Sequence, residues 1–362
     1  MAEHATFDRG MFPVLRHLAY LNAGTFGPLA QATIDAVVAQ TAIELEQGRS
    51  GAPYLDALMA IRARIRTTFA ELLAVDDAHI SLTSSTTNGC QIVLAGLGLG
   101  AEDEIVTTDE EHFGLLGPLH ASGAHVIVAR TRGLQPEDAL EAIAAAVSPR
   151  TRLIAVSHVS WMTGNVLDVD ALRARTGVVM LVDGAQSVGA IPVQAGAADF
   201  YTVSGQKWLC GPDATGALYV ADLERLRVAL PNYWGRSAHG LDGSFTPIAT
   251  AGRFDSGTIP VPSLAGLEVA MGVPPPSRFA DGLAVAGRCR ELLAGRVDIV
   301  TAPDQATIVT FGPNGDPTET VARLFDAGVI VREIPGTGWV RASCGYWTND
   351  EDLERLLAAL SP

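Results

Sequence analysis

Hydrophobic residues in this chain come in short, nearly continuous runs, and segments of helical character lie between them. The runs predict strands at 79–83, 104–108, 125–129, 153–157, 178–182, 200–203 and 217–220, with helices near 88–97, 113–122 and 136–146. Strands that lack an in–out alternation are buried on both faces. The pattern therefore predicts an α/β fold whose mostly parallel sheet is covered by helices on both faces.

The pattern changes after about residue 250, where prolines interrupt the chain more often. Beyond them we expect helices at 279–293 and 350–360 and strands at 297–300, 307–311 and 329–331. This smaller alternation predicts a second α/β unit. We expect a large domain over residues 17–255 and a small domain formed by residues 1–16 and 256–362. The strand-like piece at 17–22 could pack with either unit.

Composition narrows the class of protein. With 25 Lys and Arg against 40 Asp and Glu, the net charge is −15, which disfavours nucleic acid as a partner. No basic region precedes an apolar core at the start, and no apolar run reaches 18 residues. We therefore expect a cytoplasmic protein with no membrane span. The four cysteines form no C-x-x-C pair, so neither a disulfide framework nor a metal site is expected.

Candidate chemistry lies just after several predicted strands, where α/β sheets bind their ligands. Thr86 and Thr87 follow the strand at 79–83 and open a helix. Hydroxyls and free N–H groups at a helix N-terminus suit a phosphate, although an ordinary helix cap explains them equally. Asp183 ends a buried run. Its carboxylate needs a cation or a protonated ring nitrogen as a partner, unless it caps the next turn.

Lys207 is the only lysine in the sequence. Only an amine, and not a guanidinium, can form a Schiff base, and burial makes a lysine a usable nucleophile. A surface lysine is the alternative. His112 follows the strand at 104–108 and could stack on a planar ligand or have a structural role only. Arg341 could clamp a carboxylate or form a surface ion pair.

The order and spacing of these residues resemble the class V aminotransferase family, pyridoxal 5′-phosphate (PLP) enzymes of fold type I. The resemblance extends from Tyr20–Leu29 to Arg341–Leu357, and its most specific strings are Val182–Ser187 and Ser204–Lys207. It implies an active site shared across a homodimer and a small-molecule amino acid substrate. Two departures are Gln206, where the family often has His, and Trp161, where many relatives have Asn.

The resemblance also implies a role for each candidate residue. Lys207 would hold PLP as a Schiff base and move protons, Asp183 would pair with the ring nitrogen, and His112 would stack on the ring. Gln186 would bond the ring 3′ oxygen. The phosphate would be held by Thr86, Thr87, Ser204 and, from the neighbouring subunit, Thr258. The substrate would be bound by Arg341, with Asn22 and Trp161 beside it.

The surrounding residues decide the reaction. A cysteine desulfurase needs a mobile nucleophilic cysteine, and the segment 332–339 contains none; Cys210 and Cys344 are expected to be structural. The strings Ser157–Gly164 and Thr86–Cys90 resemble the cysteine/cystine C–S lyase branch. The expected reaction is therefore β-elimination at the C–S bond of cysteine, cystine or a related conjugate. The alternatives are an aminotransferase or epimerase similar to isopenicillin N epimerase-like proteins, and a PLP-fold binding protein without catalysis.

Overall fold

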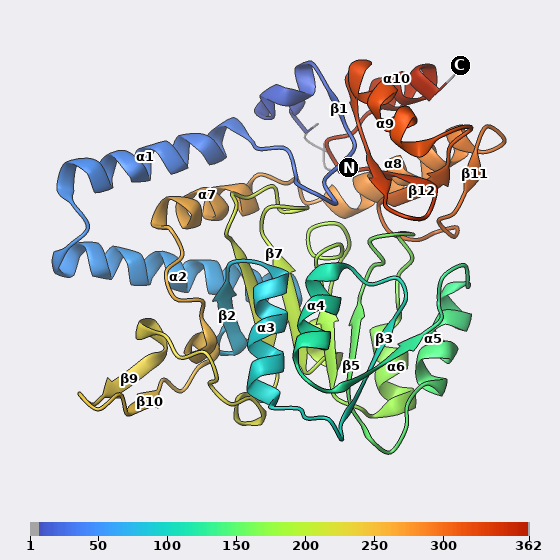
Figure 1. Ribbon diagram of the computed structural model, residues 1–362. Helices are drawn as coiled ribbons and strands as arrows, with labels where there is room; N and C mark the ends of the chain where they lie inside the picture. Colours follow the sequence, from blue (N-terminus) through green and yellow to red (C-terminus); the bar gives the residue numbers. More distant parts are fainter. Residues whose placement is uncertain (1–6, 361–362) are drawn as a thin grey trace, which may run out of the picture.

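A seven-stranded sheet forms the centre of the computed structural model, which describes residues 7–360 (Figure 1). Its strand order is β2-β8-β7-β6-β5-β3-β4. The strands are β2 (Ile80–Thr83), β3 (Glu104–Thr108), β4 (His125–Ala129), β5 (Thr151–Ser157), β6 (Met180–Asp183), β7 (Phe200–Ser204) and β8 (Gly216–Val220). Strand β8 runs antiparallel to both neighbours, and the other pairs are parallel. The predicted α/β fold with a mostly parallel sheet is confirmed.

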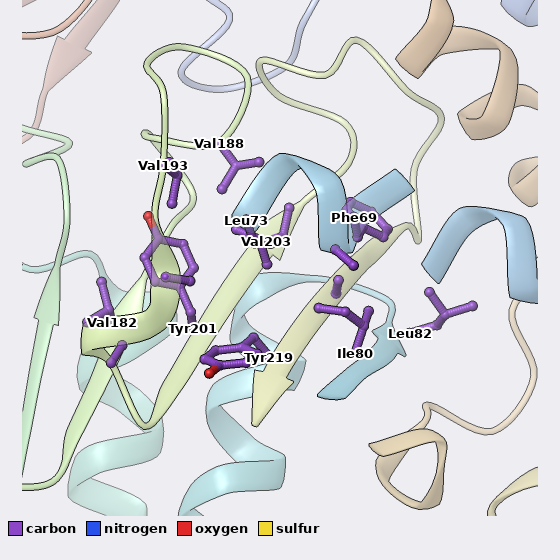
Figure 2. Close-up of a cluster of buried hydrophobic side chains, with 14 of the residues drawn as sticks. Phe69, Leu73, Ile80, Leu82, Val182, Val188, Val193, Tyr201, Val203 and Tyr219 are labelled. Atoms are coloured by element: carbon purple, nitrogen blue, oxygen red, sulfur yellow. The ribbon is translucent and has the colours of Figure 1, made fainter. Parts of the chain in front are cut away.

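Helices cover both faces of this sheet because its strands are apolar on both sides. One face packs against α3 (Thr86–Leu97) and α4 (Phe113–Ala121). The other face packs against α2 (Gly51–Leu73), α5 (Pro136–Ala145), α6 (Val169–Thr176) and α7 (Val261–Gly272). Figure 2 shows part of this second core, where Phe69 and Leu73 of α2 lie over Val203 of β7. Helix α1 (Gln31–Gln47) packs on α7.

The C-terminal part contains a four-stranded antiparallel sheet of order β11-β12-β15-β14. Its strands are β11 (Asp298–Ile299), β12 (Ile308–Gly312), β14 (Arg332–Ile334) and β15 (Trp339–Ser343). The helices of this part are α8 (Arg278–Leu293), α9 (Pro317–Asp326) and α10 (Asp350–Leu360). A separate hairpin, β9 (Arg236–His239) and β10 (Phe245–Pro247), projects from the other end of the molecule (Figure 1).

The predicted division into residues 17–255 and residues 1–16 with 256–362 stays a prediction, and two contacts cross it. Strand β1 (Ala19–Tyr20) pairs with β13 (Val329–Ile330), so the strand-like piece at 17–22 lies against the C-terminal part. Helix α7 packs against α1 and α2. The C-terminal part lies above the carboxyl ends of the parallel strands (Figure 1). The ends of these strands, where α/β sheets bind ligands, therefore face the C-terminal part.

No helix within residues 7–360 is both long and apolar enough to cross a membrane. The cytoplasmic location stays a prediction.

Candidate active site

The carboxyl ends of neighbouring parallel strands bring the candidate side chains to one edge of the central sheet. Asp183 is the last residue of β6 and Ser204 the last of β7, and Lys207 follows three residues later. His112 comes four residues after β3 and caps helix α4. Residues far apart in the sequence therefore meet where such sheets bind ligands.

Lys207 lies half-buried in the turn after β7, and its amine makes no hydrogen bond within residues 7–360. Burial lowers the pKa of Lys207 to about 8; Asp183 opposes this shift, and the positive charges of Arg341 and Arg332 favour it. A substantial fraction of the amine is therefore neutral near pH 8, and a neutral amine is the form that attacks a carbonyl carbon.

Asp183 is 4% exposed, and one of its two oxygens accepts hydrogen bonds. Its Oδ1 accepts hydrogen bonds from the Ala185 backbone N–H at 2.8 Å and from Thr202 Oγ1 at 3.4 Å. Its Oδ2 has no hydrogen-bond partner in the described part of the chain. A buried carboxylate oxygen of this kind calls for a cationic or protonated partner.

The N-terminus of α3 offers free donors. Ser85 caps this helix by accepting from the Asn88 backbone N–H at 3.1 Å, so the segment has an ordinary helix cap, and the phosphate role of the threonines stays a prediction. The hydroxyls of Thr86 and Thr87 have no partner within residues 7–360, whereas Ser204 Oγ donates to Gln206 Oε1 at 2.8 Å. Free hydroxyls at a helix N-terminus suit a phosphate.

His112 and Trp161 meet edge to face, with ring centroids 5.1 Å apart and an interplanar angle of 86°. Nδ1 of His112 accepts from the Gly114 backbone N–H at 3.0 Å, which leaves the proton of the neutral ring on Nε2. Burial, and next the charge of Lys207, lower the pKa of His112. The imidazole is therefore neutral at pH 7 and able to stack on a planar ligand.

Arg341 is 1% exposed and has no carboxylate partner in the described part of the chain. It donates to the Trp161 carbonyl at 3.0 Å and to Thr25 Oγ1 at 3.2 Å, and its Nε is buried without a partner. Burial and then the charge of Arg332 lower the pKa of Arg341 to about 9. An anion bound here relieves the cost of the buried charge.

Arg332 is a further residue of this site that sequence reasoning missed. It stands opposite Arg341 in the β14–β15 ladder, and its Nη1 lies 3.5 Å from Thr25 Oγ1, the atom that Arg341 also contacts. Its positive charge affects the pKa of Lys207, His112 and Arg341. The short segment between the two arginines was the available signal, since it favours a hairpin that places them side by side.

Gln186 is held firmly beside the site. Its Nε2 donates to the Gly24 carbonyl at 2.9 Å, and its Oε1 accepts from Trp208 Nε1 at 2.9 Å. Asn22 is joined to the site through Thr25, whose hydroxyl donates to Asn22 Oδ1 at 2.9 Å.

Thr258 is the one candidate that stands apart. Its side chain is exposed and makes no hydrogen bond within residues 7–360. The resemblance implies that Thr258 serves a neighbouring subunit, and this role remains a prediction.

The residues present fit PLP as a cofactor. Three of its polar groups would meet a group that has no partner within residues 7–360: the amine of Lys207 for its aldehyde, Asp183 Oδ2 for its ring nitrogen, and the hydroxyls of Thr86 and Thr87 for its phosphate.

Comparison with known proteins identifies the family of this chain. The model of the family "Aminotransferase class-V" matches residues 20–280. Isopenicillin N epimerase of Streptomyces clavuligerus is 29% identical, and the match covers 94% of this chain and 93% of that protein. A probable cysteine desulfurase of Xylella fastidiosa is also 29% identical, with 82% of this chain and 78% of that protein covered.

Two solved structures of C-DES share the whole fold. One is a C-DES mutant with glycine covalently linked to its PLP cofactor; it is 29% identical, has a TM-score of 0.90, and the match covers 98% of this chain and 99% of that one. The other is a complex of the cystine C–S lyase C-DES with its product cysteine persulfide; it is 29% identical, has a TM-score of 0.88, and 96% and 98% are covered. The cofactor of this protein is PLP, and the chain belongs to the class V aminotransferase family.

Proposed function

We propose that this protein cleaves the C–S bond of cystine or a related cysteine derivative by β-elimination. The observation that carries the proposal is the pair Arg341 and Arg332, two arginines without a carboxylate partner within residues 7–360, beside a half-buried lysine. Similarity to the cystine C–S lyase C-DES supports it.

Each residue has a defined task in this reaction. PLP, when bound, supplies an electron sink for the negative charge that develops at Cα of the substrate. Lys207 holds the cofactor and, once displaced by the substrate amine, accepts the proton from Cα, as its lowered pKa permits. Asp183 keeps the ring nitrogen protonated, and Arg341 binds the α-carboxylate. The Cβ–S bond then breaks with its electron pair on sulfur, and water hydrolyses the remaining three-carbon fragment to pyruvate and ammonia.

The cysteines of the chain argue against desulfurase chemistry. All four, Cys90, Cys210, Cys289 and Cys344, are buried, and burial raises the pKa of Cys90 and Cys210. A desulfurase needs an accessible thiolate to take sulfur from its substrate. An elimination that expels a thiolate or persulfide needs none.

The two arginines favour a substrate with two acidic groups. Cystine carries a second carboxylate, and a guanidinium binds a carboxylate through paired, charge-assisted hydrogen bonds. We propose that Arg332 receives this distal carboxylate while Arg341 holds the α-carboxylate.

Steady-state assays with L-cystine and S-methyl-L-cysteine test the proposal, with pyruvate and persulfide measured together. Arg341→Gln should lower kcat/KM for both substrates by about 10- to 100-fold, the loss of one charge-assisted pair. Arg332→Gln should lower kcat/KM about tenfold more for cystine than for S-methylcysteine. Equal losses for both substrates would contradict the role of Arg332, and pyruvate formation from neither would sink the lyase assignment.

An epimerase is the second candidate, and the isopenicillin N epimerase of Streptomyces clavuligerus supports it. Such an enzyme returns a proton to either face of Cα and releases an amino acid of inverted configuration. Incubation of several L-amino acids in D₂O distinguishes the two. Deuterated D-amino acid without pyruvate would identify an epimerase, whereas pyruvate without D-isomer supports the lyase.

A further inference from the structure

Trp208 directly follows Lys207 and is almost completely buried, with 2% of its surface exposed. It lies in an aromatic cluster with Trp347, whose ring centroid is 6.5 Å away. Its indole N–H donates to Gln186 Oε1 at 2.9 Å, and Gln186 is itself buried. The residue after the lysine thus contacts the side chain expected to touch the cofactor ring.

The indole fixes which end of the Gln186 amide faces outward. An indole nitrogen can only donate, so the amide oxygen must point toward it and the amide nitrogen must point away. That nitrogen donates one hydrogen to the Gly24 carbonyl at 2.9 Å. An amide nitrogen carries two hydrogens, and the second has no acceptor among residues 7–360.

We propose that Trp208 is a positioning residue whose indole N–H holds the Gln186 amide with its free hydrogen toward the 3′ oxygen of bound PLP. The inference rests on the proposed placement of the ring beside Gln186. Without the indole, only the Gly24 carbonyl holds this orientation, so the amide rotates more easily and the hydrogen bond to the ring oxygen is weakened.

Loss of this donor should shift the pH midpoint of the cofactor's absorbance change in a definite direction. A hydrogen bond donated to the ring oxygen stabilises the anionic form of that oxygen. It therefore lowers the pKa of the bound cofactor. Removing the donor should therefore raise the pH midpoint of the visible absorbance change of the holoenzyme. The expected shift is about half a pH unit to one pH unit, the worth of one ordinary hydrogen bond.

The test is a pH titration of the visible spectrum for Trp208→Phe, Gln186→Ala and the double variant. Trp347→Phe is the matched control, because it makes the same truncation in the same cluster but removes an N–H that donates to the Tyr20 carbonyl at 3.2 Å. The charged groups around the ring site are unchanged in every variant: Asp183, Lys207, His112, Arg332, Arg341 and Glu111.

Trp208→Phe and Gln186→Ala should both raise the midpoint, and the double variant should rise no further than Gln186→Ala alone. Trp347→Phe should leave the midpoint within 0.2 pH unit, a margin of roughly a fifth of the effect of one hydrogen bond. Should Trp208→Phe fail to fold, a benzothiophene in place of the indole keeps the shape and removes only the N–H.

The outcomes separate this inference from the site on which it rests. A shift in Gln186→Ala without one in Trp208→Phe, or an equal shift in Trp347→Phe, overturns the role of Trp208 alone. No shift in Gln186→Ala overturns both that role and the placement of the ring.

Discussion

Lys207 is the one side-chain amine in this chain, because every other position counted among its 25 Lys and Arg residues is arginine. Its environment is unusual for a lysine: it is half-buried, it makes no hydrogen bond within residues 7–360, and Asp183 and two arginines lie near it. A lone amine in such surroundings allows its chemistry to be followed without interference from other lysines.

Borohydride reduction of the holoenzyme should fix PLP to the peptide that contains Lys207 and to no other peptide. Lys207→Ala should abolish the adduct. Lys207→Arg is the matched control, since it keeps the positive charge but cannot form a Schiff base. Peptide mass spectrometry reads the result, and an adduct that survives either substitution would contradict the assignment.

The reactivity of Lys207 in the apoprotein should follow its deprotonation, with a midpoint near pH 8. Asp183 attracts the ammonium form, so Asp183→Asn should lower the midpoint. Arg332 repels that form, so Arg332→Gln should raise it. The measurement is the rate of modification of the Lys207 peptide by an amine reagent at several pH values.

Arg130→Gln is the control for these charge changes, because Arg130 is exposed and is not among the charges that shift the pKa of Lys207. Its midpoint should stay near pH 8. A midpoint above pH 10 in the unaltered protein would show that the amine is an ordinary surface lysine.

The candidate residues differ in how far the sequence could indicate them. Lys207 and Asp183 stood out because one is unique and the other ends a buried run, and the structure brings them together with His112 and Arg341. Arg332 was missed although the short segment before Arg341 favours a hairpin, because its place opposite Arg341 depends on the pairing of the two strands. Gln206, which departs from the family pattern, bonds Ser204 instead of standing free.

At the scale of elements, the strands of the central sheet were predicted because each contains a short apolar run, although β4 is partly exposed. The exposed hairpin of β9 and β10 was not predicted. Helix α1 was not predicted. It has no continuous apolar stripe: Val38 and Leu45 are 61% and 84% exposed, and Thr33 is its one buried residue. The pairing of β1 with β13 could not be predicted from the sequence either, because a two-residue strand is too short to show which strand it pairs with.

The segment after β1 passes very close to the turn that carries Lys207. The Gly27 backbone N–H donates to the Gln206 carbonyl at 2.8 Å, and a Cβ at Gly27 would overlap the Lys207 carbonyl and approach Cys210 Sγ to 2.9 Å. Only a residue without a side chain allows this approach.

Gly27→Ala should therefore lower the free energy of unfolding by about 1–3 kcal/mol, the usual cost of overpacking. Urea denaturation of the apoprotein measures it. Gly196→Ala is the control, because a Cβ there meets nothing within 4 Å, and it should change stability by less than about 0.5 kcal/mol. Equal stability of the two variants would contradict the close approach.

At the scale of the whole molecule, the site lies between the central sheet and the C-terminal part, and Thr258 is left on the surface. Asp255, just before it, is bound by Arg62 at 2.6 Å and by Arg66 of α2, and accepts from the Leu82 backbone N–H at 2.8 Å. These contacts anchor the chain just before Thr258. An anchored position on the surface is what a residue that contacts a neighbouring subunit needs.

Hybrid dimers should reveal whether two subunits share each site. Lys207→Ala and Thr258→Ala homodimers should each bind PLP poorly or without a covalent bond. In a hybrid of the two, shared sites would place both defects at one site and leave the other intact. The purified hybrid should then hold about half of the covalent PLP content of the unaltered dimer, one intact site of two, and an unfractionated random mixture, half of whose dimers are hybrids, about a quarter. Separate sites would give no restoration.

The interior position of all four thiols also determines where sulfur goes after the reaction. Sulfur passes from a persulfide to a protein when a thiolate attacks it, and the surface of this chain presents no thiol that could do so. Under the proposed reaction, sulfur therefore leaves as a diffusible small molecule. Any carrier protein that receives it must react with that molecule in solution through a thiol of its own.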